Sequence, residues 1–186
     1  MSVTRERIME LAEELILTRG YNAFSYQDIS SELGIKNAAI HYYFPSKANL
    51  GTSIIKNNGQ RFEEMVQNMK IMKFDEAKQL ESFLRIYAKS NREQKICVIG
   101  SLGPDFNTLP EASQAELKQM TNRILQWLSS ILETGRNSGI FSFKGDSRNR
   151  ALLILSNMIA SLQLTRVLDK TEFKGIHQTL LDDLKG

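Results

Sequence analysis

Apolar residues recur at helical spacing along most of this chain. In the first segment Ile8, Leu11 and Leu15 lie three or four residues apart, so they fall on one face of a helix. No stretch of convincing length alternates between apolar and polar residues, as a half-buried strand would. The pattern predicts an all-α protein of about nine helices. They are expected at roughly residues 4–19, 26–33, 37–44, 47–72, 75–92, 94–102, 111–137, 147–168 and 171–184.

Two of these helices are short and lie close together. Ser25 followed by Asp28 resembles a capping box, which marks a helix start. Gly34 stands where a helix end favours a left-handed residue, and Pro45 ends the second helix because proline disfavours α geometry in the residue before it. Ser46 can cap the helix that follows. Two short helices joined by a tight turn are typical of a helix-turn-helix, whose second helix enters the DNA major groove.

Charge supports this interpretation only locally. The chain has a net charge of +3, which by itself does not indicate a nucleic-acid-binding protein. Residues 33–62, however, contain no Asp or Glu, and they cover the turn, the second short helix and much of the next one. An acid-free segment of this length also arises by chance at this composition. The basic residues within it are Lys36, Lys47, Lys56 and Arg61.

The run AIHYYFPSKANL, residues 39–50, resembles the signature of the TetR/AcrR family of bacterial transcriptional regulators. The resemblance covers about residues 4–55. Two residues depart from the family pattern: Lys36 stands where the family often has Ser or Thr, and His41 stands where it most often has Tyr. It implies a helix-turn-helix domain at residues 1–50 and an effector-binding and dimerisation domain at residues 51–186. The helix at 47–72 is expected to link the two.

The expected DNA contacts follow from groove chemistry. Asn37 can pair with adenine, Lys36 can donate to guanine, and two alanines can touch a thymine methyl group. The aromatic residues, His41 and Lys47 are better suited to phosphates, and an alanine at Lys47 should lower the salt dependence of binding by about one unit. Tyr43 also fits a core position, and Gln27 and Lys36 also fit plain surface. The predicted DNA-binding residues are Gln27, Lys36, Asn37, Ala38, Ala39, His41, Tyr42, Tyr43 and Lys47.

Residues 151–165 form a second informative segment, because fifteen residues pass without a charge. A membrane span needs about 20 apolar residues, so no membrane insertion is expected. A helix that is apolar all round is covered on several sides. It is either a central core helix or, as we favour, a helix with one face in the core and another on a second subunit. The family resemblance implies a homodimer held by two C-terminal helices. The predicted interface residues are Ile154, Met158, Ser161, Leu162, Thr165 and Leu180.

The resemblance also implies a repressor that leaves its double-stranded DNA operator when a small molecule enters a pocket in the C-terminal domain. No cluster of ionised residues marks a charged ligand, which favours a largely apolar effector. Each candidate lining residue also fits an ordinary core. The candidates are Phe62, Met65, Met69, Phe83, Tyr87, Phe106, Trp127 and Asn157.

One cysteine, Cys97, cannot form an intrachain disulfide, and the N-terminus lacks the apolar core of a signal peptide. Both features favour the cytoplasm. Cys97 is either an inert residue or a redox or electrophile sensor, with Lys95 close enough in sequence to lower its pKa. The alternative function is a helix-turn-helix regulator that responds to a protein partner or to Cys97 modification.

An enzyme is not expected. The two histidines, His41 and His177, lie in the DNA-facing helix and near the end of the chain. The sequence has no His-x-x-x-His pair, no Cys-x-x-Cys, no glycine-rich phosphate loop and no Gly-x-Ser-x-Gly. Accordingly, we predict no catalytic residue, metal site or cofactor.

Overall fold

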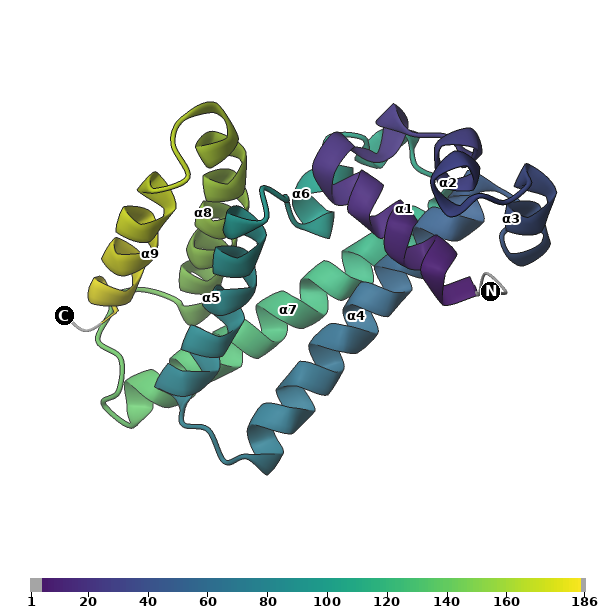
Figure 1. Ribbon diagram of the computed structural model, residues 1–186. Coiled ribbons are helices and arrows are strands. Elements are labelled where there is room, and N and C mark those ends of the chain that lie inside the picture. Colours follow the sequence, from purple (N-terminus) through teal and green to yellow (C-terminus); the bar gives the residue numbers. More distant parts are fainter. Residues whose placement is uncertain (1–4, 185–186) are drawn as a thin grey trace.

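The computed structural model describes residues 5–184, which form nine α-helices and two 3₁₀ turns, with no β-strand among them (Figure 1). The all-α prediction is confirmed. The elements are α1 (Arg5–Arg19), η1 (Tyr21–Ala23), α2 (Tyr26–Leu33), α3 (Asn37–Tyr43), α4 (Lys47–Ile71), α5 (Glu76–Arg92), α6 (Val98–Leu102), η2 (Phe106–Thr108), α7 (Glu111–Asn137), α8 (Ser147–Val167) and α9 (Glu172–Asp182).

The helices form an N-terminal helix-turn-helix domain and a larger helical C-terminal domain. Helices α1, α2 and α3 gather at one end, and α4 runs from them to the far end of the molecule beside α7 (Figure 1). Helix α7 also packs against α5 and α8, and α9 packs against α8 and α5. Helix α4 therefore belongs to both domains. No helix within residues 5–184 is both long enough and apolar enough to cross a membrane.

Local capping explains why the helix-turn-helix helices begin and end where they were predicted to. The Ser25 amide donates to Asp28 Oδ2 at 2.7 Å, which holds the start of α2. Gly34 ends α2 with φ of 65°, a left-handed conformation that glycine adopts without strain. Ser46 Oγ accepts from the Asn49 amide at 3.2 Å and caps α4. The expected start of the first helix at residue 4 lies outside the described residues.

Helix α6 is shorter than its predicted range of 94–102. It begins only at Val98, because the segment before it makes tertiary contacts in place of helical ones. The Ile96 amide donates to the carbonyl oxygen of Leu17 in α1 at 3.0 Å. The remaining helices differ from prediction by at most two residues at either end.

Helix α8 has two different faces. One face is buried against the other helices of the subunit, and the opposite face is exposed although it is also apolar. Five of the residues predicted to form a dimer interface are in the subunit core, so their assignment is wrong; Leu180 on α9 is half-buried. The uncharged run offered no polar side by which to tell the faces apart. The misassigned residues are Ile154, Met158, Ser161, Leu162 and Thr165.

Candidate DNA-binding surface and effector cavity

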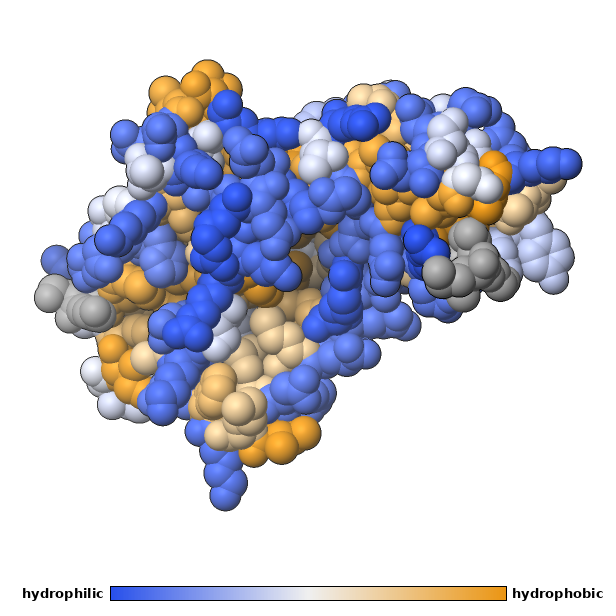
Figure 2. Space-filling model, in the orientation of Figure 1, coloured by the Kyte–Doolittle hydropathy of each residue, from blue (hydrophilic) through white to orange (hydrophobic). Residues whose placement is uncertain are grey.

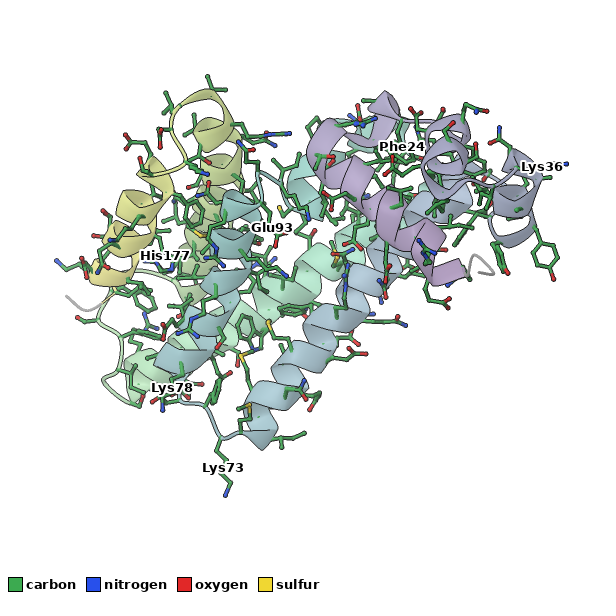
Figure 3. The ribbon with its side chains drawn as sticks, in the orientation of Figure 1. Phe24, Lys36, Lys73, Lys78, Glu93 and His177 are labelled. Atoms are coloured by element: carbon green, nitrogen blue, oxygen red, sulfur yellow. The ribbon has the colours of Figure 1, made fainter. Side chains whose placement is uncertain are left out.

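The core of the N-terminal domain presents the outer face of α3 to solvent. Ile40 and Phe44 are fully buried, and Tyr26 Oη donates to the Phe44 carbonyl at 2.9 Å, which fixes the end of α3 against α2. Figure 3 shows Lys36 projecting away from the protein at this end. Eight of the nine predicted DNA-contacting residues are exposed here: Gln27, Lys36, Asn37, Ala38, Ala39, His41, Tyr42 and Tyr43.

Asn37 and Gln27 bring two amide side chains together at the junction of α2 and α3. Asn37 Nδ2 donates to Gln27 Oε1 at 3.3 Å, and Gln27 Nε2 donates to Ser31 Oγ at 3.1 Å. This chain of hydrogen bonds orients Asn37 before any DNA is present. An asparagine amide held in this way is suited to paired hydrogen bonds with adenine.

The aromatic residues of α3 lie at its C-terminal end. Tyr42 is 82% exposed, and its ring meets that of Tyr43 edge to face at a centroid distance of 5.0 Å. The His41 ring packs on Tyr26 at 4.8 Å, and its Nδ1 lies 3.2 Å from the Pro45 carbonyl oxygen. A carbonyl only accepts, so Nδ1 carries the proton in this contact. The neutral ring then offers Nε2 only as an acceptor, and a phosphate contact by His41 requires the imidazolium.

Lys47 has a partner other than the expected phosphate. Its Nζ donates to the Phe24 carbonyl oxygen at 2.5 Å and lies over the rings of Tyr21 and Phe24, at 4.8 and 4.3 Å from their centroids. Burial lowers the pKa of the ammonium, and the carboxylate of Asp28 partly opposes this shift. Lys47 therefore ties the start of α4 to the connection between α1 and α2.

Arg5 is a basic residue near this surface that the sequence analysis did not select. Its guanidinium lies over the Phe44 ring, 4.9 Å from the centroid, and reaches Ser53 Oγ at 3.5 Å. It thus places a positive charge beside the end of α3. Only tertiary packing brings these residues together, because 39 positions separate Arg5 from Phe44.

A cavity of about 540 Å³ lies between the two domains, with walls from α1, α4, α5, α6 and α7. Four predicted effector-pocket residues line it, namely Phe62, Met65, Phe83 and Tyr87. Figure 2 shows apolar surface in the hollow between α5 and α4, bordered by hydrophilic side chains. The sequence analysis missed a further set of lining residues, which includes Leu17, Ile96, Val98, Ile99, Met120 and Ile124.

The other four candidates do not line this cavity. Met69 is buried in the core, and Phe106 lies beneath Lys118, whose Nζ is 5.2 Å from the ring centroid. Asn157 is exposed on the outer face of α8, where its Nδ2 donates to the Leu153 carbonyl at 2.7 Å. These three assignments are wrong, because helical spacing does not reveal which helices converge on one space.

Trp127, the fourth candidate, packs behind two residues that line the cavity. Its ring contacts Phe62 and Phe83 at centroid distances of 5.5 and 5.4 Å. On its other side it borders an open groove of about 1150 Å³, lined largely by polar residues of α4 and α7. Trp127 Nε1 is buried and has no hydrogen-bond partner among the described residues. The groove's polar walls suit an apolar ligand less well than the inner cavity.

Ion pairs cross the mouth of the cavity and join α1 to the C-terminal domain. Arg61 of α4 pairs with Glu13. Lys95 Nζ lies 2.7 Å from Glu14 and 2.9 Å from Glu93, at the end of α5 nearest α1 (Figure 3). Glu13 and Glu14 of α1 are therefore held by residues outside the helix-turn-helix.

Hydrogen bonds also hold the end of α1 to the C-terminal domain. The last carbonyl groups of a helix have no partner within it. Three consecutive carbonyls of α1 accept hydrogen bonds from three separate segments, and the Ile16 carbonyl also accepts from the Gly20 amide at 3.1 Å. The pairs are Ser101 Oγ to Ile16 at 2.7 Å, the Ile96 amide to Leu17 at 3.0 Å, and Arg166 to Thr18.

Cys97 lies in the cavity wall at the start of α6. Its Sγ accepts a hydrogen bond from the Gly100 amide at 3.3 Å, and burial raises the pKa of its thiol. Lys95 does not lower that pKa as expected, because its ammonium is engaged by Glu14 and Glu93. A thiol in this environment has less thiolate at neutral pH than a free cysteine, and the thiolate is the reactive form.

An exposed helix-turn-helix joined to a larger helical domain, with a cavity between the two, is the arrangement of a DNA-binding transcriptional regulator. A family described as "Bacterial regulatory proteins, tetR family" matches residues 8–52. The whole chain is 31% identical to a TetR transcriptional regulator from Legionella pneumophila, and its fold matches that crystal structure over 100% of this chain and 99% of that one, with a TM-score of 0.86. The chain belongs to the TetR family. The family predicted from the AIHYYFPSKANL run is confirmed, and so is a regulator in place of an enzyme.

Two curated relatives are more distant. The chain is 28% identical over 122 residues to an uncharacterised HTH-type transcriptional regulator of Lactococcus lactis, a match that spans 63% of this chain and 62% of that protein. It is 23% identical over 160 residues to the HTH-type transcriptional repressor BepR of Brucella suis, across 82% of this chain and 76% of that protein.

Proposed function

We propose that this protein is a transcriptional repressor that binds a palindromic operator as a homodimer and is released by a small, largely apolar effector. The observation that carries the proposal is the composition of the cavity wall. Helix α1 of the DNA-binding domain supplies Glu10, Glu13, Glu14 and Leu17 to it. An effector in the cavity would therefore touch the DNA-binding domain directly.

The exposed face of α3 supports DNA recognition. Lys36, Asn37 and the two alanines after it occupy the first turn, the part of a recognition helix that reaches base edges. Tyr42 and Tyr43 lie one turn later, where phosphate contacts fix the position of the helix on the duplex. We assign residues 1–50 to this domain and residues 51–186 to effector binding and dimerisation, with α4 shared. Because a bacterial operator lies in the cytoplasm, we place the protein there.

The outer face of α8 supports dimerisation. Leu153 and Leu164 are 54% and 51% exposed, and no charged residue lies between them in the sequence. A group of exposed leucines on one helix face marks an interaction surface. A second copy related by a two-fold axis would bury the same face twice and would supply a second recognition helix. The assigned interface residues are Leu152, Leu153, Ala160, Leu164, Val167 and Leu168.

Release would act through α1. The cavity wall and the hydrogen-bonded end of α1 belong to one contact region, so a ligand that separates the walls strains both. An effector changes the equilibrium only as far as it binds one arrangement more tightly than the other. A cavity of about 540 Å³ favours a small ligand over the alternative of a protein partner.

A footprint tests the proposal. The full-length protein is incubated with DNA flanking its own gene, and we expect two symmetric half-sites spaced by one or more helical turns, about 34–36 Å each. Light scattering should give the mass of a dimer. A monomer that protects a single half-site would contradict the proposed dimer. If no flanking region is protected, the protein does not control the genes beside its own.

A further inference from the structure

The charges around the cavity neutralise one another. Glu13 pairs with Arg61, and Lys95 lies between Glu14 and Glu93. Lys89 Nζ is 3.8 Å from Glu93. The one other charged lining residue, Glu10, is exposed to solvent. Burying a charge without a partner costs free energy, so a charged ligand would need a residue of opposite charge in the wall. The charged lining residues are already paired or, in the case of Glu10, exposed to solvent.

The inner walls are aromatic and aliphatic. Phe62 and Phe83 meet at a centroid distance of 6.4 Å with rings 78° apart, and Phe83 and Tyr87 meet at 5.4 Å and 67°. Rings set at steep angles to one another leave faces and edges open to a further ring, which is the arrangement that aromatic groups prefer. Met65 and Met120 add flexible, polarisable side chains.

Tyr87 supplies the one buried hydroxyl in this wall. The residue is 4% exposed and it lines the cavity. Burial raises the pKa of the Tyr87 phenol well above its usual value, so the hydroxyl stays neutral and can both donate and accept. Cys97 Sγ is engaged by Gly100, and the Asn58 amide donates to Glu13 and Ile54. Ser90 lines the same cavity but is only half-buried.

We propose that the effector is a neutral aromatic compound with one hydroxyl or carbonyl oxygen, and that this oxygen hydrogen-bonds to Tyr87 Oη. The assignment rests on the proposed function, because it names the ligand class of the same cavity. Aromatic surface provides affinity, and Tyr87 selects for the oxygen. The paired charges at the mouth select against anions and cations.

Four probes of one shape test this assignment on the full-length protein by calorimetry: naphthalene, 1-naphthol, 1-naphthoate and 1-naphthylmethylammonium. We expect 1-naphthol to bind about three- to tenfold more tightly than naphthalene, the range expected of one net hydrogen bond. Both charged probes should bind at least about tenfold more weakly than 1-naphthol. The basic lining residues already pair with glutamates, and Glu10, the one carboxylate outside these pairs, is exposed to solvent, where its attraction for a cation is weak.

The variant Tyr87→Phe isolates the hydrogen bond. It should bring the affinity of 1-naphthol down to that of naphthalene and leave naphthalene unchanged. Tyr42→Phe, on the DNA-binding surface, is the matched control and should preserve the wild-type ratio. If Tyr87→Phe does not fold, the ratio of the two neutral probes on the wild-type protein still decides the point.

The outcomes separate this inference from the proposed function. Equal binding of naphthalene and 1-naphthol, tighter binding of a charged probe, or binding of none of the four overturns the ligand class. The effector response itself is overturned by a different result, in which a broad library of small molecules never releases the protein from its footprinted operator.

Discussion

Lys47 Nζ donates a 2.5 Å hydrogen bond to the carbonyl oxygen of Phe24, 23 residues earlier in the chain. The ammonium lies over the Phe24 ring as well, so one side chain holds both the backbone and the ring of that residue. Phe24 precedes the cap of α2, and Lys47 is the first residue of α4. The lysine that closes the family-like sequence run is therefore placed to fix the angle between the helix-turn-helix and the linking helix.

We predict that Lys47→Ala lowers the free energy of unfolding by about 1–2 kcal/mol, through loss of a charged hydrogen bond and a cation–π contact. The slope of log affinity for operator DNA against log salt should stay unchanged, because the ammonium is engaged by the Phe24 carbonyl and by the rings of Tyr21 and Phe24. Fluorescence anisotropy across a salt series measures this slope. Lys36→Ala, which removes an exposed charge, is the control and should lower the slope by about one unit. The same decrease in Lys47→Ala would mean that its ammonium turns outward to a phosphate.

Asn37→Ala should weaken specific binding by about 1–3 kcal/mol, with the loss concentrated at one base pair of each half-site. The reason is that Gln27 holds the Asn37 amide in place before binding. Competition among operators with single base changes measures this effect. Asn122→Ala on α7, exposed and distant in sequence, is the control. A uniform loss on all sequences would instead assign Asn37 to a phosphate.

Leu164→Glu should convert the dimer to a monomer at micromolar concentration. Leu164 is half exposed on the outer face of α8, and a carboxylate placed in an apolar interface without a partner costs several kcal/mol. Size-exclusion chromatography with light scattering measures the mass. Ile71→Glu introduces the same charge at another exposed apolar residue, at the end of α4, and should leave the mass unchanged. A Leu164→Glu protein that remains dimeric would place the interface elsewhere.

Ser101→Ala should destabilise the protein by about 0.5–1.5 kcal/mol, because it removes the hydrogen bond to the Ile16 carbonyl and leaves that carbonyl with the Gly20 amide as its donor. Hydrogen exchange should show faster opening at the end of α1 than in α2. Ser156→Ala, whose hydroxyl is exposed and bonds only within α8, should have little effect. Equal exchange in both helices would argue that Ser101 does not hold α1 to the C-terminal domain.

Cys97 should react slowly with iodoacetamide at neutral pH, and its reaction rate should reach a plateau at higher pH than that of an ordinary thiol. Burial raises its pKa in the folded state, so the neutral thiol contributes stability that is fully present below the unfolded pKa and is lost as pH rises through the folded pKa. Mass spectrometry follows the modification and anisotropy follows DNA binding, with Cys97→Ser as the unreactive control. Fast modification at pH 7 that abolishes DNA binding would support the sensor alternative.

The sequence by itself determined the helices and the DNA-binding motif. The caps of α2 and α4 involve residues only a few positions apart: Ser25 with Asp28, Gly34, and Ser46. Local sequence therefore determines the start and end of α2 and the start of α4. The exposed face of α3 was equally predictable, because Ile40 and Phe44 are four residues apart and both bury on one side. Local spacing alone carries this information.

Only the tertiary structure decided which groups meet. Lys47 turns inward because Phe24 and Tyr21 pack beside it, and α8 buries Met158 but exposes Leu164 because α5 and α7 lie on one side of it alone. The cavity exists because α1, α4 and α5 converge there, from positions as much as about 80 residues apart. Such contacts depend on the packing of distant segments against one another, and no spacing within a single helix encodes them.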